Sequence, residues 1–346
     1  MKRLAPLLLL VLAACAGGGA MDPRPPLAGA ELRPAPVPDP EGENQRLTAP
    51  PLMFTLAAEA PGATLPVAHW PAEGETKAVL LALHGYGDYG ASTFGRAARA
   101  WAARGIAAYA PDQRGFGRAP GRMRWPGAET LPKDAAAAFA AVAARHPGTP
   151  VFVAGHSMGG AVALAAAGRG GFPGAAGLIL LAPAVWGGDN LNPILRLSAW
   201  SAAQIAPDKR WTGEGVVEIQ PTDDWDMLVA LSRDPLHYAA PSGREFLGLV
   251  RLMDEALDAA PGADLPALIL LGENEEVVSP ASVEALPAAL PGPARLEYAP
   301  GGWHMLLRDR GASRVWSRVA DWMLAPTPPA ETPDTPAPQP GAQPGD

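Results

Sequence analysis

The stretch Val151-Phe-Val-Ala-Gly-His-Ser157-Met-Gly-Gly160 decides the fold, because it joins a short apolar run to an alanine-rich helical segment through a G-x-S-x-G turn. The glycines permit a sharp turn that side chains would block, and the helix that follows presents its N-terminus to Ser157. The alternative is a glycine-rich turn with an idle serine. A strand before the turn and a helix after it favour Ser157 as a nucleophile.

Outward from this turn, short apolar runs alternate with Ala-rich helical segments from about Leu52 to Ala325. This alternation predicts an α/β fold with a mostly parallel sheet and helices on both faces. Strands are expected at 78–83, 106–110, 151–154, 178–181, 267–271 and 295–298. Helices are expected at 93–103, 133–145, 159–167 and 314–324. Residues 189–260 break the rhythm and are interpreted as a helical insertion over one end of the sheet.

A serine nucleophile needs a histidine base and an acid, which follow it along the chain in the order Ser, acid, His on this kind of fold. Position and elimination select His304, on the loop after the strand expected at 295–298. The other histidines fit this order less well. His69, His84 and His146 precede the nucleophile, with His146 at a helix end, His156 lies inside the turn, and His237 lies in the insertion.

The acid is expected just after the strand at 267–271, where the chain reads Gly272-Glu273-Asn274-Glu275-Glu276. Counting from Gly272, the third residue is Glu275, and we predict that Glu275 orients His304. Glu273 and Glu276 are alternatives. For each glutamate, a solvated loop charge is the ordinary role.

Two backbone amides complete the predicted site. The turn His84-Gly-Tyr86-Gly87 follows an early strand and can supply the Tyr86 N–H, while the Met158 N–H follows the nucleophile. Two such donors form an oxyanion hole for a tetrahedral intermediate. A plain glycine turn is the alternative for this segment.

Composition excludes several other classes. The chain has 346 residues, 48% of them hydrophobic, which allows one large domain or two small ones. A net charge of -8 and the lack of a basic run exclude a nucleic-acid partner. A single cysteine excludes an intrachain disulfide and a Cys-based zinc site, and neither a metal nor a cofactor is expected.

The N-terminal segment predicts export. Residues 1–14 have the charged and apolar regions of a signal peptide, and Leu12-Ala-Ala-Cys15 looks like a bacterial lipobox. We therefore expect lipidation of Cys15 and a membrane-anchored lipoprotein in the periplasm or at the outer membrane, with ordinary secretion as the alternative. Residues 15–51 are expected to form an irregular Pro-rich linker, and residues 326–346 a disordered Pro-rich tail.

Five segments carry a resemblance to a known family: residues 155–160, 84–87, 112–117, 233–236 and 301–309. Together they resemble the α/β-hydrolases of the monoacylglycerol lipase and lysophospholipase group, also called serine aminopeptidase-like hydrolases. The resemblance implies a hydrolase core at 52–188 and 261–325, a cap at 189–260, and single-chain lipid esters as substrates. Other esters, peptides or a catalytically inactive surface scaffold are alternatives, and no oligomeric state follows. Glu275 departs from the aspartate that is usual in this group.

Overall fold

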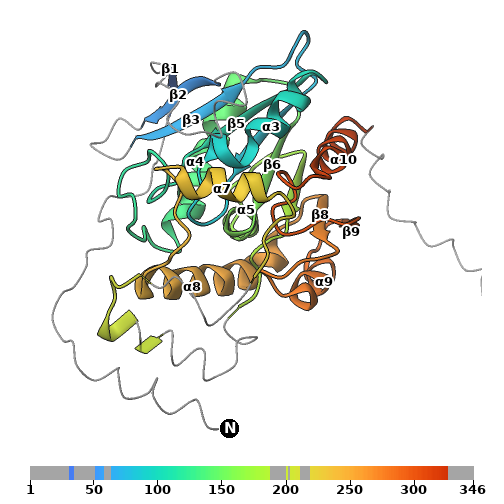
Figure 1. Ribbon diagram of the computed structural model, residues 1–346. Helices are drawn as coiled ribbons and strands as arrows, with labels where there is room; N and C mark the ends of the chain where they lie inside the picture. Colours follow the sequence, from blue (N-terminus) through green and yellow to red (C-terminus); the bar gives the residue numbers. More distant parts are fainter. Residues whose placement is uncertain are drawn as a thin grey trace, which may run out of the picture.

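The computed structural model describes residues 31–34, 51–57, 64–187, 200–201, 203–210 and 219–325 (Figure 1). The predicted signal peptide, Cys15, the C-terminal tail and residues 188–199 and 211–218 of the predicted insertion lie outside these ranges. The described chain folds around one nine-stranded sheet with the order β1-β2-β3-β5-β4-β6-β7-β8-β9.

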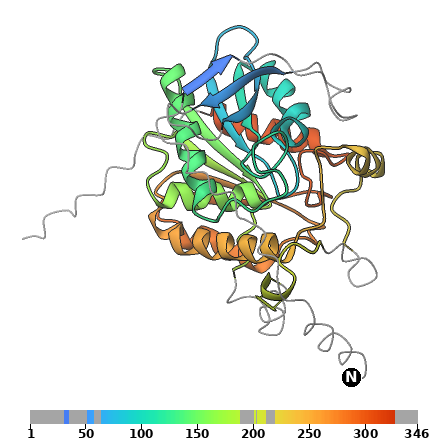
Figure 2. The same cartoon turned by 90° about the vertical axis from the view of Figure 1, so that its left-hand side faces the viewer.

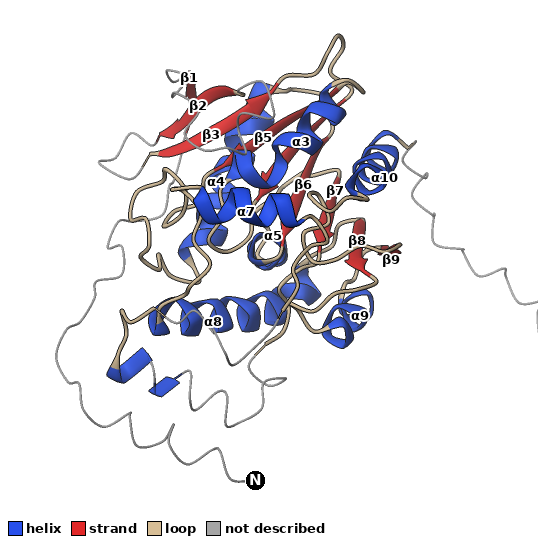
Figure 3. Ribbon diagram, in the orientation of Figure 1, coloured by secondary structure: helices blue, strands red, loops and turns tan. Residues whose placement is uncertain are grey.

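The sheet is antiparallel at one end and parallel through the rest. The pairs β1–β2, β2–β3 and β3–β5 are antiparallel. The remaining pairs, from β5–β4 to β8–β9 along the sheet, are parallel. Figure 3 shows these strands in red between the helices. The strands are β1 (Glu31–Pro34), β2 (Leu52–Ala57), β3 (Leu65–Trp70), β4 (Ala78–Leu83), β5 (Ile106–Pro111), β6 (Val151–His156), β7 (Gly177–Leu181), β8 (Ala267–Gly272) and β9 (Ala294–Ala299).

Burial explains why the central strands read as continuous apolar runs. Every residue of β4, β5, β6, β7 and β8 is buried, as expected for parallel strands with helices over both faces. The edge strand β9 is only partly buried and accordingly carries charged residues. The six predicted strands match β4 to β9 within two residues at each end, and the expected mostly parallel α/β sheet is confirmed.

Helices cover both faces of the sheet. On one face α3 (Gly90–Ala102) packs against α10 (Ala312–Leu324), and on the other α4 (Thr130–Arg145) packs against α5 (Met158–Gly168) (Figure 2). The remaining helical elements are α7 (Trp225–Arg233), α8 (Gly243–Ala259), the short 3-10 helix η3 (Ala260–Gly262) and α9 (Pro280–Ala289). None of the described helices is long and apolar enough to cross a lipid bilayer.

One expectation about the N-terminal linker differs from the structure. Glu31–Pro34, expected within an irregular linker, forms β1 against β2, since a short strand at the sheet edge needs hydrogen bonds on one side only. Helix α8, which lies within the predicted insertion 189–260, packs on α5. At their ends the two helices are so close that a Cβ on Gly168 would lie 2.0 Å from the Ala259 carbonyl oxygen.

Residues 219–240, here called the covering segment, lie over the carboxyl edge of the parallel strands. The segment contains α7, and several of its hydrogen bonds reach loops at that edge. The Pro221 carbonyl accepts the Met305 N–H at 2.9 Å, and Tyr238 N–H donates to the Gly87 carbonyl at 2.9 Å. The Tyr89 hydroxyl donates to Asp234 at 2.7 Å. The covering segment is therefore the described part of the predicted insertion that roofs this edge.

Candidate active site

Ser157 occupies a strained turn between β6 and α5. Its φ of 52° and ψ of -118° are unfavourable for a residue with a side chain, and such strain is concentrated at functional sites. The neighbouring glycines make the turn possible: a Cβ on Gly155 would lie 2.2 Å from the Gly159 carbonyl oxygen, and one on Gly159 would lie 2.0 Å from the Leu83 carbonyl oxygen. The Ser157 N–H donates to Leu181 in β7 at 3.0 Å, which anchors the turn to the sheet.

The sheet order brings Ser157, Glu275 and His304 to the same edge. Ser157 directly follows β6, Glu275 follows β8, and His304 follows β9, and these strands run parallel. Loops at the carboxyl ends of parallel strands converge on one side of a sheet, where α/β proteins usually bind ligands.

Glu275 and His304 are joined by a buried hydrogen bond. The Nδ1–H of His304 donates to Glu275 Oε2 at 2.9 Å and lies 3.1 Å from Oε1. Only 6% of the His304 side chain and 1% of the Glu275 side chain are exposed. Burial raises the pKa of Glu275, but hydrogen bonds from His304 and from the Val278 and Val277 amides outweigh burial and leave that pKa below its usual value. Glu275 is thus ionised, and Nε2 of His304 is left as a hydrogen-bond acceptor.

The neighbouring glutamates contact backbone amides instead. Glu273 is exposed and accepts the Gly301 N–H at 2.8 Å. Glu276 is exposed and accepts the Gln220 N–H at 2.8 Å, which ties its loop to the covering segment. Among the described residues, Glu275 is the acidic side chain that hydrogen-bonds His304.

His156 links the turn at Ser157 to the loop that carries His304. Its Nε2–H donates to the His304 carbonyl at 3.0 Å, and the two imidazole rings lie 5.1 Å apart. Burial, followed by the charges of His304 and Arg308, lowers the pKa of His156 to about 3, so this ring is neutral. In the described ranges, the Ser157 hydroxyl makes no hydrogen bond to another residue. The imidazole of His304, with its free Nε2, lies beside that of His156, the residue directly before Ser157.

The predicted oxyanion amides are available at this edge. Within the described chain, neither Tyr86 N–H nor Met158 N–H donates to another residue. His84 explains the orientation of the first amide: its Nδ1–H donates to the Gly85 carbonyl at 2.8 Å. Because a trans peptide is planar, the Tyr86 N–H points away from that carbonyl. The Met158 N–H is free because it lies in the first turn of α5.

His84 is itself held by two hydrogen bonds from one residue. Gln113 donates its backbone N–H to His84 Nε2 at 2.9 Å and its side-chain amide to the His84 carbonyl at 2.7 Å. Burial lowers the pKa of His84, which keeps the ring neutral and able to accept from Gln113. Sequence reasoning recognised the glycine turn but not this bracing role. The sequence signal for this role was His84 itself, because a glycine turn does not need a histidine, whose ring can both donate and accept hydrogen bonds.

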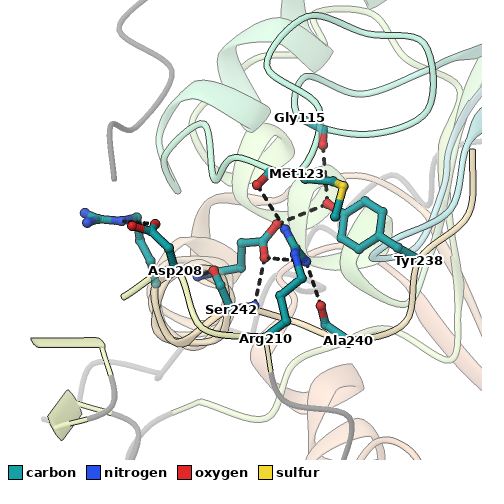
Figure 4. A network of polar contacts seen from close by, with 9 residues as sticks. Gly115, Met123, Asp208, Arg210, Tyr238, Ala240 and Ser242 are labelled. Carbon is teal, nitrogen blue, oxygen red and sulfur yellow. Dashed lines mark hydrogen bonds and ion pairs between the residues drawn. The ribbon is translucent and has the colours of Figure 1, made fainter. Parts of the chain in front are cut away.

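A polar network joins Tyr238 of the covering segment to Arg210 and to the start of α8 (Figure 4). The buried Glu245 carboxylate accepts from Arg210 at 3.1 Å and from the Tyr238 hydroxyl at 3.1 Å, and it also caps α8 through the Ser242 N–H at 2.8 Å. The Tyr238 ring packs edge-on to Tyr86, with ring centroids 5.6 Å apart. The position of the oxyanion turn therefore depends on residues that are remote in sequence.

The apolar side chains of the predicted insertion, which could bind an acyl chain, are only partly described. Met227 and Leu231 of α7 are buried, which fits an ordinary core role, whereas Trp225 and Phe246 are exposed. Leu191, Ile194, Leu195 and Leu197 lie outside the described residues. No cluster of three or more potential metal-ligating His, Cys, Asp or Glu side chains occurs within the described ranges.

Known proteins that resemble this chain define its family. Residues 74–311 match the family described as serine aminopeptidase, S33, and the chain belongs to this family of α/β-hydrolases. Monoacylglycerol lipase of Mycolicibacterium smegmatis is 26% identical over 263 residues, which cover 74% of this chain and 91% of that protein. Human monoglyceride lipase is 34% identical over 119 residues, 34% of this chain and 38% of the human protein.

Solved structures show the same fold. A soluble variant of monoglyceride lipase from Saccharomyces cerevisiae superposes with a TM-score of 0.66 at 21% identity, over 84% of this chain and 98% of that chain. A carboxyl esterase from Bacillus coagulans superposes with a TM-score of 0.66 at 17% identity, over 80% of this chain and 100% of the esterase. The family and these relatives identify the chain as a carboxylic ester hydrolase.

Proposed function

We propose that the protein is a serine hydrolase that cleaves single-chain carboxylic esters, of the monoacylglycerol or lysophospholipid type, through an acyl-enzyme on Ser157. The hydrogen bond between Glu275 and His304 carries this proposal, because a buried, ionised carboxylate on Nδ1 leaves Nε2 free to accept a proton. The strained turn at Ser157 and the unpaired amides of Tyr86 and Met158 support it.

Acylation begins when Ser157 Oγ attacks the ester carbonyl carbon while His304 Nε2 takes the hydroxyl proton. The carbonyl oxygen becomes an oxyanion that accepts hydrogen bonds from the Tyr86 and Met158 amides. Glu275 stabilises the resulting imidazolium. When the intermediate collapses, the bond from carbon to the alcohol oxygen breaks, and His304 returns the proton to the departing alcohol.

Deacylation repeats these steps with water in place of the serine. His304 takes a proton from water, and the hydroxide attacks the acyl carbon of the ester on Ser157. The same two amides donate hydrogen bonds to the second oxyanion. Collapse releases the fatty acid and returns the proton to Ser157 Oγ, so no cofactor is consumed.

The relatives support the substrate class. The M. smegmatis protein is named a monoacylglycerol lipase, and the match covers 91% of it. Other esters or peptides are alternatives within the same chemistry. A panel of p-nitrophenyl esters and monoacylglycerols with short to long acyl chains tests the class. The proposal expects kcat/KM to rise with chain length for single-chain substrates and to be low for triacylglycerols and for peptide amides.

A fluorophosphonate probe tests the mechanism directly, because it reacts covalently with activated serines. We expect one label per wild-type chain, located on Ser157 by peptide mass spectrometry, and neither label nor esterase activity in Ser157→Ala. Ser232, which is exposed on α7 and donates to the Val229 carbonyl, supplies a matched control in Ser232→Ala, which should label normally. Absence of a label on the folded wild-type protein would favour the inactive scaffold.

We further propose that the mature protein is a lipoprotein anchored through Cys15, with the membrane as its partner and the periplasmic or outer-membrane surface as its location. The lipobox sequence supports this proposal. Diacylglycerol together with a further acyl chain gives stable anchoring, whereas a single chain does not. An anchored hydrolase would work where single-chain lipids collect.

A further inference from the structure

A buried ion pair joins the oxyanion turn to the loop that carries His304. Arg308 Nη2 lies 2.7 Å from Asp88 Oδ2, and only 3% of the Arg308 side chain and 4% of the Asp88 side chain are exposed. Asp88 follows Tyr86 by two residues, and Arg308 follows His304 by four. Each member of the pair is thus close in sequence to one component of the proposed site.

Both members of the pair are also fixed to α3. Asp88 accepts the Thr93 hydroxyl at 2.9 Å, and Arg308 Nη1 donates to the Ser92 hydroxyl at 3.1 Å. Asp88 Oδ1 accepts the Tyr89 N–H at 2.9 Å at the start of that helix. Burial raises the pKa of Asp88, but the charge of Arg308, together with His237, His84 and the Tyr89 N–H, outweighs burial and holds that pKa well below its usual value. The Asp88 carboxylate is therefore ionised opposite the Arg308 guanidinium.

Stability alone does not account for such a pair. Removing two charges from water costs about as much as their attraction returns, and well-packed apolar residues can often replace a buried pair without loss of stability. A guanidinium, however, is a rigid planar fork with donors in fixed directions. It can therefore set a distance between two loops more accurately than apolar packing can.

We propose that Asp88 and Arg308 are positioning residues that hold His304 at a fixed distance from the Tyr86 amide. Acylation needs the base and the oxyanion donor to converge on one ester group, and a misplacement of about 1 Å can cost about 100-fold in rate. The inference rests on the proposed function of Ser157, His304 and Tyr86. Neither member of the pair contacts the reacting atoms, so its effect should fall on kcat.

A neutral, hydrogen-bonding pair tests this inference. The double variant Asp88→Asn with Arg308→Gln removes both charges together and leaves no single buried charge behind. The matched control is Asp134→Asn with Arg114→Gln. That pair is equally buried, with 4% and 0% of the side chains exposed and Nε to Oδ2 at 2.8 Å, but it joins α4 to the loop after β5.

Hydrolysis of p-nitrophenyl butyrate is measured per reactive serine, counted by fluorophosphonate labelling to completion, and unfolding midpoints are measured alongside. We expect the Asp88/Arg308 double variant to lose about 10-fold to 100-fold in kcat with KM within about threefold. The control should keep kcat within about twofold while its unfolding midpoint falls by a similar amount. Equal kcat per reactive serine in the two double variants would overturn the inference.

A conservative variant covers the case in which the double variant does not fold. Arg308→Lys retains the charge opposite Asp88 but loses the planar fork and the second donor. It should lose severalfold in kcat, whereas Arg114→Lys should not, and an unchanged kcat in Arg308→Lys would overturn the inference. A wild-type protein that lacks a reactive serine would reject the proposed function and with it any positioning role. If the wild-type protein has a reactive serine but the Asp88 and Arg308 variants keep its kcat, only the positioning role would be rejected.

Discussion

Glu275 binds His304 with one carboxylate oxygen and the backbone of its own loop with the other. Oε2 accepts the imidazole Nδ1–H at 2.9 Å, while Oε1 accepts the amides of Val277 and Val278 at 2.6 and 3.0 Å. The loop thus folds around its own glutamate. This arrangement uses the additional methylene that distinguishes glutamate from the aspartate usual in the group, because the carboxylate reaches both the amides and the ring.

The first prediction concerns this carboxylate. Glu275→Gln should lower kcat by about 1000-fold or more, because an amide neither fixes the imidazole tautomer nor stabilises the imidazolium. Glu275→Asp should also lose activity, because the shorter side chain cannot keep both sets of hydrogen bonds. Steady-state hydrolysis of p-nitrophenyl butyrate measures the effect.

Glu273→Gln and Glu276→Gln are the matched controls, since both glutamates are exposed and accept backbone amides. Each control should change kcat by less than about threefold. Similar losses in all three glutamine variants would mean that Glu275 has no special role in orienting His304.

The second prediction concerns strain at Ser157. Its φ of 52° is unfavourable for serine but acceptable for glycine. Ser157→Gly should therefore raise the free energy of unfolding by about 1 kcal/mol, whereas Ser157→Ala should leave it nearly unchanged. Urea denaturation of both inactive variants beside the wild type measures the difference. A glycine variant less stable than the alanine variant would show that the turn is not strained in the folded protein.

The third prediction concerns stability in acid. Burial lowers the pKa of His69 to about 4, against an ordinary value of 6.5, although the ring donates to the Ala108 carbonyl at 3.0 Å. The unfolded chain therefore binds a proton at His69 before the folded chain does, so stability is lost as the pH falls from 6.5 towards 4. From pH 7 to pH 5 this residue should cost about 2 kcal/mol.

His69→Phe is the matching variant, because a phenyl ring can still stack on Tyr109, whose centroid lies 4.0 Å from the imidazole. The free energy of unfolding of this variant should decline less steeply between pH 7 and pH 5 than that of the wild type. Parallel pH profiles for the two proteins would contradict the assigned pKa of His69.

The fourth prediction concerns the anchor. Wild-type protein expressed with its own N-terminus should fractionate with membranes and partition into detergent, while Cys15→Ser should be soluble or retain its signal peptide. Mass spectrometry of the mature N-terminus identifies the modification on Cys15. An unmodified mature chain that begins at Gly17, after cleavage behind Ala16, would demonstrate ordinary secretion instead.

The sheet was largely predictable, because strands buried on both faces must be apolar at every position. The runs that form β4 to β8 therefore stand out in the sequence, and the G-x-S-x-G turn identifies which of them carries Ser157. The strands β2 and β3 were not predicted. They lie in the antiparallel end of the sheet, where Thr55 interrupts the apolar run of β2, and Pro66 and His69 interrupt that of β3.

Long-range contacts account for the other differences. The helical period of α8 shows that one face is buried, but periodicity does not say whether that face packs on α5 or on a cap. Likewise, counting from Gly272 predicts Glu275, yet nothing local pairs Asp88 with Arg308 or Gln113 with His84. Such contacts depend on the folded arrangement of segments that are far apart in the chain.

The short strand β1 has a consequence for self-association. It pairs with one side of β2 and has only four residues, the last of which, Pro34, has no N–H to donate. An uncovered strand invites pairing with another molecule, whereas a short edge that ends in proline discourages it. Glu31–Pro34 therefore acts as a shield, and a protein shortened to begin at residue 51 would expose β2 as a template for aggregation.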